Sequence, residues 1–207
     1  MLTSRFGIEI EFTGITRNEA AIVTAEYLGG TITNTGDYYD TKKVIAPDGR
    51  VWKIMSDGSI FCQKRNDRQK VSTTREYSVE LVSPILTYRE DIECLQELVR
   101  RLRKAGAFAN SSCGVHIHLD GSNHTPRSIR NFINIIASKN DLFYKALQIA
   151  PERMSYCKKM DSILVDKMNR RKPKTMRAIE EIWYEGYSES RDRHYHNSRY
   201  HFLNLHS

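Results

Sequence analysis

The stretch "RFGIEIEF", residues 5–12, decides the fold, because it alternates without a break between apolar and polar side chains. Glu9 and Glu11 fall on one face of an extended chain. The opposite face is apolar and carries Phe6, Ile8, Ile10 and Phe12. This two-residue period predicts a β-strand that buries one face and leaves acidic groups on the other.

Strand and turn signals fill much of the sequence around this stretch. A hairpin is predicted around Asp48-Gly49, with a second turn at Asp57-Gly58. The segment "CQKRNDRQK", residues 62–70, is interpreted as a charged loop. Further strands are predicted in "REYSVELVSP" (75–84, ended by Pro84), in "CGVHIHLDG" (113–121) and in "RYHFLNLHS" (199–207), which ends the chain.

Helix signals lie between the predicted strands. Thr16 and Glu19 form the pattern of a capping box, which opens a helix to about Leu28. Apolar residues keep helical spacing from Tyr88 to Ala105. Another helix is predicted in "TPRSIRNFINIIASKN" (125–140), with Thr125 as N-cap and Pro126 at the first helical position, and a second helix follows it to about Ala150. Further helical stretches are predicted around 160–168 and 175–186.

This order of elements predicts one α+β domain over residues 1–207. The sequence shows no β-α-β-α alternation and no glycine-rich phosphate loop, which argues against a Rossmann or P-loop nucleotide site. Its four cysteines form no C-x-x-C pair, so a zinc ribbon is not expected. Isolated thiols indicate a reducing compartment, and we expect a cytoplasmic location. The net charge of +7 favours anionic partners, and no apolar run reaches membrane-spanning length.

Three predicted strands place ionisable groups where a packed sheet face would be apolar. These groups are Glu9 and Glu11, then Glu76 and Glu80, then His116 and His118. Residues two apart on a strand point the same way at a spacing of ~7 Å, so neighbouring strands can surround a cation. Carboxylates with one histidine suit Mg²⁺ or Mn²⁺ better than zinc. A simply solvated face is the alternative, but adjacent carboxylates repel one another unless water or a cation screens them.

The ordered motifs carry a family resemblance. They are "GIEIEF" (7–12), "WKIMSDGSI" (52–60), "EYSVELVSPIL" (76–86), "CGVHIHLDG" (113–121), "PERMSYCKKM" (151–160) and "RYHFLNL" (199–205). Together they resemble the amidoligases of mobile elements, a group of carboxylate–amine ligases with the glutamine synthetase-like fold. The resemblance implies a curved antiparallel sheet with helices on its convex side. It also implies an ATP-dependent reaction in which an amine attacks an acyl phosphate, with Mg²⁺ or Mn²⁺ bound on the concave face.

The resemblance also implies roles for individual residues. It assigns Glu9, Glu11, Glu80 and His116 as metal ligands and His118 as a contact to the ATP phosphates. It places Asp57 in the substrate or amine pocket, Arg199 at a phosphate, and Arg153 and Lys158 at the nucleotide or substrate. Taken alone, Asp57 would be interpreted as a turn former, and the three basic residues as solvated surface.

The resemblance leaves substrates and partners open. The carboxylate and the amine are expected to be small molecules or peptides, and neither a membrane nor nucleic acid is indicated as a partner. Family members carry a further strand with a Glu and an Arg after the position of Ser207. We therefore expect either a shortened, inactive ligase or a second copy or partner chain that completes the sheet.

Two other classes of function compete with the ligase. "HIHLDG" resembles the metal-binding signature of metallo-β-lactamase-like hydrolases, which would use His116, His118 and Asp120. Gly121 stands where that signature carries another histidine, and the hydrolase leaves Glu9 and Glu11 unexplained. The second alternative is a non-enzymatic basic module, but aromatic residues do not interleave the basic runs as they do in single-strand nucleic-acid binders.

Overall fold

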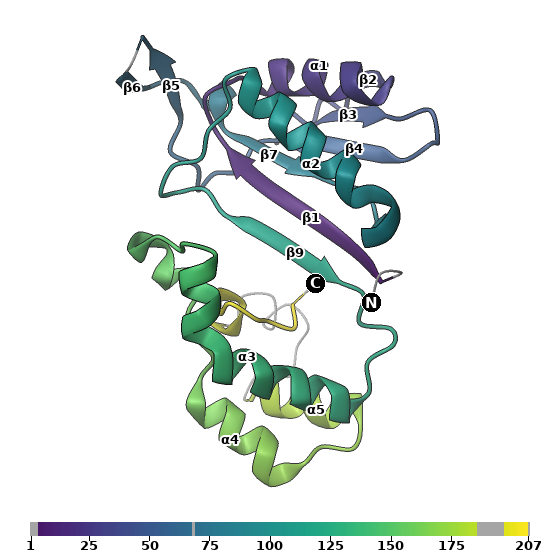
Figure 1. The fold of residues 1–207 in the computed structure, drawn as a ribbon, viewed down its shortest axis with the longest axis vertical. Helices are drawn as coiled ribbons and strands as arrows, with labels where there is room; N and C mark the ends of the chain where they lie inside the picture. The colour runs from purple at the N-terminus through teal and green to yellow at the C-terminus, as the bar shows by residue number, and fades with distance from the viewer. Residues whose placement is uncertain (1–3, 68, 186–196, 207) are drawn as a thin grey trace. The chain divides into compact units, whose positions relative to one another are not determined.

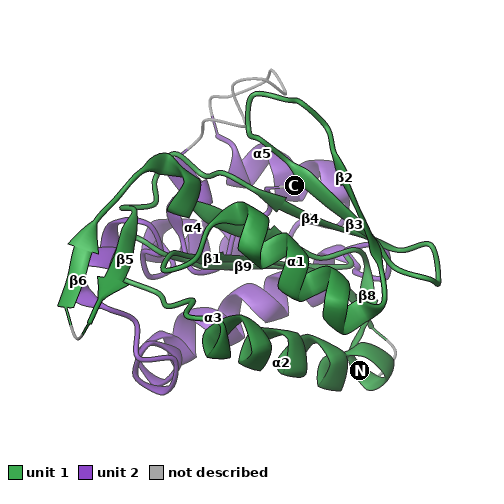
Figure 2. Cartoon of the chain, turned by 90° about the horizontal axis from the view of Figure 1, so that it is seen from above, with its two compact units in different colours: residues 1–120 green, residues 121–207 purple. Residues whose placement is uncertain are grey.

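The computed structural model describes residues 4–67, 69–185 and 197–206. The chain forms two compact units, residues 1–120 and 121–207, which are coloured separately in Figure 2 and are called unit 1 and unit 2. Among the described residues, no helix combines the length and the apolar character that a membrane span requires. The prediction of a single catalytic domain over residues 1–207 stays a prediction.

Unit 1 is built around strand β1, Arg5–Phe12, the stretch that alternates in the sequence (Figure 1). In the described part of the chain its sheet has seven strands in the order β2-β3-β4-β7-β1-β8, with β9 also paired to β1, and every pairing is antiparallel. The other strands are β2 Thr31–Asn34, β3 Lys42–Ile45, β4 Val51–Met55, β7 Val79–Val82, β8 Leu86–Thr87 and β9 Val115–Leu119.

Two helices cover the apolar face of this sheet (Figure 1). Helix α1, Arg17–Leu28, begins with the predicted capping box, in which the Glu19 backbone N–H donates to Thr16 Oγ1 at 3.2 Å. Helix α2, Tyr88–Lys104, follows the predicted helical spacing. Their buried residues pack against the sheet in one core, which includes Ala21, Ala25, Leu95, Leu98, Leu102, Phe12, Val44, Trp52, Ile54 and Leu81. Mixed helices and antiparallel strands confirm the α+β prediction, and they leave the opposite face of the sheet uncovered by α1 and α2.

Unit 2 is helical in its described part. Its elements are α3 Pro126–Ala146, the 3-10 turn η2 Pro151–Ser155, α4 Ser162–Arg171, α5 Met176–Trp183 and the 3-10 turn η3 Asn197–Tyr200. Thr125 caps α3 and Pro126 opens it, as predicted. A second core joins these helices through residues that include Ile133, Met168, Ile179, Ile182 and Trp183.

Three predicted elements in the first half of the chain or at its centre are wrong. Residues 62–70 are not a loop but most of a hairpin, β5 Gln63–Asn66 with β6 Gln69–Ser72, which Asp67 turns with a φ of 54°. Glu76 does not share a strand with Glu80, because it lies in the 3-10 turn η1, Arg75–Tyr77, before β7 begins. The two helices predicted between Thr125 and Ala150 are one continuous helix, α3. The expected break between them is absent, because one side of α3 stays buried as far as Tyr144.

The predicted strand at the end of the chain is also wrong. Within its described residues, "RYHFLNLH" begins inside the turn η3 and pairs only through an isolated bridge between His201 and Lys158. Its apolar side chains Phe202, Leu203 and Leu205 pack against the helical core of unit 2 instead of entering a sheet. Tyr184 fixes this segment, because its hydroxyl donates to the Leu205 carbonyl at 2.8 Å.

Candidate metal centre

The face of the sheet opposite α1 and α2 gathers acidic and imidazole side chains. The register sets Glu11 of β1 opposite Glu80 of β7, and Glu9 of β1 opposite His116 of β9. Since β1 is paired on both sides, its two glutamates meet a carboxylate on one side and a histidine on the other. The antiparallel register therefore brings together groups that are 69 to 107 residues apart in the chain.

Three of these carboxylates come close enough to share one cation. One oxygen each from Glu11, Asp57 and Glu80 lies within 4.8 Å of the other two. Glu11 is buried, with 5% of its surface exposed, and the other two are half-buried. Hard oxygen ligands in this number are the kind that Mg²⁺ and Mn²⁺ take, usually with added water.

Asp57 enters the cluster from the loop after β4 because Ser78 holds its backbone. The Asp57 N–H donates to Ser78 Oγ at 3.0 Å, and the Ser78 hydroxyl donates to the Asp57 carbonyl at 2.6 Å. Ser78 directly precedes β7, so this double contact fixes Asp57 beside Glu80. The Ser59 N–H also donates to Asp57 Oδ1 at 2.6 Å, which is the turn-forming role suggested by the sequence.

The family resemblance implied that Asp57 lies in the substrate or amine pocket, and its place among the carboxylates was not predicted. The register of the sheet explains why Asp57 lies there. Met55, two residues before Asp57, lies opposite Glu80 in the register of β4 and β7. A turn that begins directly after Met55 must therefore pass near the Glu80 side chain. The pairing of β4 with β7, however, is a long-range contact that the sequence did not reveal.

Glu11 is oriented from the β9 side. The Gly114 N–H donates to Glu11 Oε2 at 2.6 Å, and the Glu11 N–H donates to the Gly114 carbonyl at 3.0 Å. The other oxygen, Oε1, lies 3.6 Å from His116 Nε2, which is an ion-pair distance rather than a hydrogen bond. Glu11 thus has one oxygen fixed by backbone and the other turned toward the imidazole.

The two histidines pair with different glutamates. His118 Nε2 lies 3.1 Å from Glu9 Oε1, whereas His116 faces Glu11. The contact with Glu11 raises the pKa of His116 above its usual 6.5, and the negative charges of Glu9 and Glu80 act in the same direction. The protonated, positively charged form of His116 is therefore favoured at the edge of the cluster.

Glu80 shows the strongest electrostatic effect in the cluster. Burial, followed by the negative charges of Glu9, Asp57 and Glu11, raises the pKa of Glu80 from 4.5 to about 7. Without a cation, the group of carboxylates therefore holds a proton near neutral pH. A divalent cation would replace that proton and offset the repulsion between the carboxylates, so the residues present fit such an ion.

The three basic residues predicted to bind nucleotide or substrate lie in unit 2, where the structure brings them near one another. The Lys158 N–H donates to the Tyr200 carbonyl at 2.7 Å, which joins the η2 side of the unit to η3. The Arg153 guanidinium lies 4.6 Å from the Tyr156 ring, and that ring lies 6.2 Å from the Tyr200 ring. Arg199 lies 5.9 Å from the Tyr200 ring, in the turn η3 rather than in a strand. Their role at a nucleotide stays a prediction.

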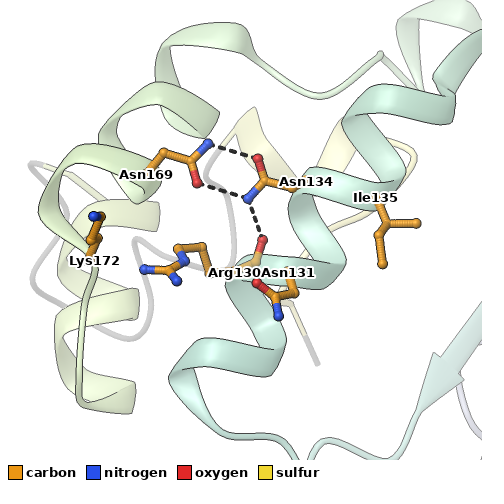
Figure 3. Close-up of a pocket in the computed structure, with 6 residues that line it drawn as sticks. All are labelled: Arg130, Asn131, Asn134, Ile135, Asn169 and Lys172. Atoms are coloured by element: carbon orange, nitrogen blue, oxygen red, sulfur yellow. Dashed lines mark hydrogen bonds between the residues drawn. The ribbon is translucent and has the colours of Figure 1, made fainter.

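Unit 2 also has a pocket of about 540 Å³ that contains none of the predicted site residues. Figure 3 shows Asn134 of α3 and Asn169 of α4 facing one another across two amide hydrogen bonds of 2.9 and 2.8 Å. The pocket is lined by Arg130, Asn131, Asn134, Ile135, Asn169 and Lys172. The paired amides satisfy one another, so we interpret this pair as a contact that joins α3 to α4.

The residues of the hydrolase alternative do not form one ligand set. Both Nε and a terminal nitrogen of Arg5 lie within 2.9 Å of Asp120 Oδ2. Asp120, directly after β9, is therefore engaged by Arg5 at the start of β1, while His116 and His118 face Glu11 and Glu9. Among the described residues, the group of close carboxylates includes neither Asp120 nor a histidine.

One comparison with known proteins gives a match. The model of a family described as "Putative amidoligase enzyme" matches residues 2–207, which is nearly the whole chain. No curated protein and no solved structure matches the chain. The matched range spans both units, from β1 to the end of unit 2.

Proposed function

This chain belongs to the amidoligase family, and on that premise we propose that it is an ATP-dependent carboxylate–amine ligase. In this reaction ATP transfers its terminal phosphoryl group to a carboxylate and leaves as ADP. An amine then attacks the acyl phosphate and loses a proton, and an amide and inorganic phosphate result. The carboxylate and amine substrates are small molecules or peptides. An antiparallel sheet with acids on one face and helices on the other supports, within the same proposal, a glutamine synthetase-like ligase fold.

The observation that carries the proposal is the convergence of three carboxylates from three separate segments. Glu11, Asp57 and Glu80 lie within sharing distance of one cation, and burial together with the negative charges of Glu9, Asp57 and Glu11 raises the pKa of Glu80 to about 7. A protein that used these acids only for solubility would have no need to crowd them, because crowding costs stability. The proposed cation site explains that cost.

The chemistry explains why such a cluster is useful. Transfer of phosphate from ATP to a carboxylate brings two anions together, and a divalent cation supplies charge neutralisation for that step. Glu11, Asp57 and Glu80 would hold the ion, with Glu9 and His116 at its edge. His118, held by Glu9 at 3.1 Å, would orient toward a phosphate oxygen. Arg153, Lys158 and Arg199 stay proposed contacts for the nucleotide or substrate.

Substitutions of glutamate by glutamine, which remove one negative charge and keep the shape of the side chain, test the assignment. Glu11→Gln and Glu80→Gln should remove Mn²⁺ binding and Mn²⁺-dependent ATP binding, measured by calorimetry, while circular dichroism shows the fold unchanged. Glu76→Gln is a matched control, because it also removes one negative charge near β7 but lies on the exposed turn η1. If Glu11→Gln and Glu80→Gln bind ATP and Mn²⁺ as the unaltered protein does, the metal assignment is wrong.

A second measurement separates the ligase from the alternatives. The ligase should release ADP only when Mg²⁺ or Mn²⁺, a carboxylate and an amine are all present. Ester cleavage without ATP would favour the hydrolase instead, although the contact between Arg5 and Asp120 speaks against that site. Nucleic-acid binding with a steep salt dependence and no nucleotide requirement would favour a basic binding module.

A further inference from the structure

A pair of lysines lies on the same sheet face as the carboxylates. Lys43 of β3 is directly opposite Lys53 of β4 in the register, Lys53 is opposite Val82 of β7, and Val82 is opposite Glu9 of β1. Residues that are opposite one another across a sheet point to the same face. Lys43 and Lys53 therefore belong to the face that carries Glu9, and the same row reaches Glu9 and His116 at the edge of the candidate metal centre.

This lysine pair forms no close contact with an acidic side chain in the part of the chain that the structure describes. Neither Lys43 nor Lys53 forms an ion pair or a side-chain hydrogen bond there, whereas their neighbour Lys42, on the other face, contacts Asn34 at 3.2 Å and Asp40 at 3.4 Å. Like charges directly opposite on neighbouring strands destabilise a sheet. The charge repulsion between Lys43 and Lys53 therefore lowers the stability of the sheet, as the repulsion between Glu11 and Glu80 does.

The two like-charged pairs have opposite signs and a fixed separation. Strand β7 alone lies between β4, which carries Lys53, and β1, which carries Glu9 and Glu11. Two interstrand spacings amount to ~10 Å between the backbones. A ligand that spanned this face would meet a cation-binding group at one end and two ammonium groups at the other.

We propose that Lys43 and Lys53 form a subsite for an anionic oxygen group of the ligand that occupies this face. The group is a carboxylate of the substrate or a phosphate of the nucleotide, since both present the negative oxygens that lysine ammonium groups bind as point charges. The subsite itself follows from the register and the charges. Only the naming of substrate and nucleotide rests on the proposed ligase function.

Lysine signals in the NMR spectrum test the subsite directly. The protein carrying ¹³C at the lysine Cε atoms is titrated with pyrophosphate, and separately with glutarate, in the absence of any divalent metal. The Lys43 and Lys53 signals should shift and reach saturation with at least one of these anions. The signals of Lys64 and Lys104, which are exposed lysines of unit 1 outside this row, should stay nearly unchanged.

Matched double variants complete the test. Lys43→Gln with Lys53→Gln should weaken binding of the responding anion by about tenfold, the loss expected when charge-assisted contacts are removed. Lys64→Gln with Lys104→Gln removes the same two charges and should leave the affinity unchanged. A response to pyrophosphate assigns the subsite to nucleotide phosphate, and a response to glutarate assigns it to a substrate carboxylate.

The proposal is overturned if neither anion shifts Lys43 and Lys53 more than the control lysines, or if the control variant loses as much affinity. Because these titrations contain no metal, they do not depend on Glu11 or Glu80. A failed metal site combined with a saturable lysine response would therefore reject the ligase assignment and keep the subsite. The opposite combination would reject the subsite alone.

Discussion

Glu11 and Glu80 are direct partners across β1 and β7, and their carboxylates belong to one cluster with Asp57. Adjacent strands with like charges directly opposite repel one another, and burial makes the repulsion stronger because less water screens it. The folded protein must therefore bind a proton or a cation at this position. Burial, followed by the neighbouring negative charges, raises the pKa of Glu80 to about 7, which favours a proton at this position.

The stability of the metal-free protein should fall as the pH rises from about 4.5 to about 7. Because the pKa of Glu80 is higher in the folded than in the unfolded chain, its contribution is fully present below 4.5 and is lost as the pH passes its folded value of about 7. The raised pKa of His116 also makes the stability fall as the pH rises, because the folded chain binds that proton more tightly than the unfolded chain does. Urea unfolding at several pH values measures this trend.

Glu80→Gln should remove most of that pH dependence. At pH 8 the variant should be more stable than the unaltered metal-free protein by about 1–2 kcal/mol, a value reduced for the partial exposure of the side chain. At pH 4 the two should be nearly equal, because Glu80 is then protonated in both states. A Glu76→Gln control should show no such gain, and a gain of equal size there would contradict the explanation.

Mn²⁺ should stabilise the protein more strongly at pH 8 than at pH 5. The cation competes with the proton held by the carboxylates, so binding should release protons near neutral pH and weaken as the pH falls. Thermal unfolding with and without excess Mn²⁺ measures the stabilisation, and calorimetry in buffers of different ionisation enthalpy counts the protons. Equal stabilisation at both pH values would show that the ion binds elsewhere.

Ser78→Ala should weaken both the fold and the metal site. The buried hydroxyl accepts from the Asp57 N–H and donates to the Asp57 carbonyl, so its loss leaves two backbone groups without this partner, at a cost of about 1–3 kcal/mol. The freed loop should also lower the affinity for Mn²⁺, because Asp57 is no longer held beside Glu80.

Ser83→Ala provides the comparison at the other end of β7. Its hydroxyl accepts from the Ile8 N–H at 2.9 Å and donates to the Pro84 carbonyl at 2.7 Å, so the variant should lose similar stability. It should keep the Mn²⁺ affinity, since Ser83 does not contact Asp57. Equal loss of Mn²⁺ binding in both variants would mean that general destabilisation, not positioning, controls the site.

Local patterns in the sequence predicted the elements that depend on neighbouring residues. The alternation of residues 5–12, the capping box at Thr16 and the N-cap at Thr125 are satisfied within a few residues, so they were predicted correctly. The turn η1 shows the limit of such patterns. Glu76 continues the alternation of β7 in the sequence, but Arg17 of α1 donates to the carbonyls of Arg75 and Ser78, and this distant contact supports the turn.

The candidate site depended on contacts that no local pattern contains. Glu9, Glu11, Glu80 and His116 were expected to lie near one another, and the register places them on neighbouring strands. Asp57 joined the carboxylates only because Ser78 fixes its loop. At the end of the chain, the apolar residues predicted a strand, but Phe202, Leu203 and Leu205 are half-buried against the helical core of unit 2. Packing against helices, not strand pairing, accounts for that pattern.

The reciprocal amide pair of Asn134 and Asn169 should contribute a measurable coupling between α3 and α4 (Figure 3). Removing either side chain leaves a half-buried amide without its partner, so Asn134→Ala and Asn169→Ala should each cost about 1–2 kcal/mol. The double variant loses the pair only once, and should therefore cost less than the two single changes together by about 0.5–2 kcal/mol. Urea unfolding of the four proteins gives this coupling energy. Additive losses would show that the two amides are solvated independently and that α3 and α4 are joined by their apolar contacts alone.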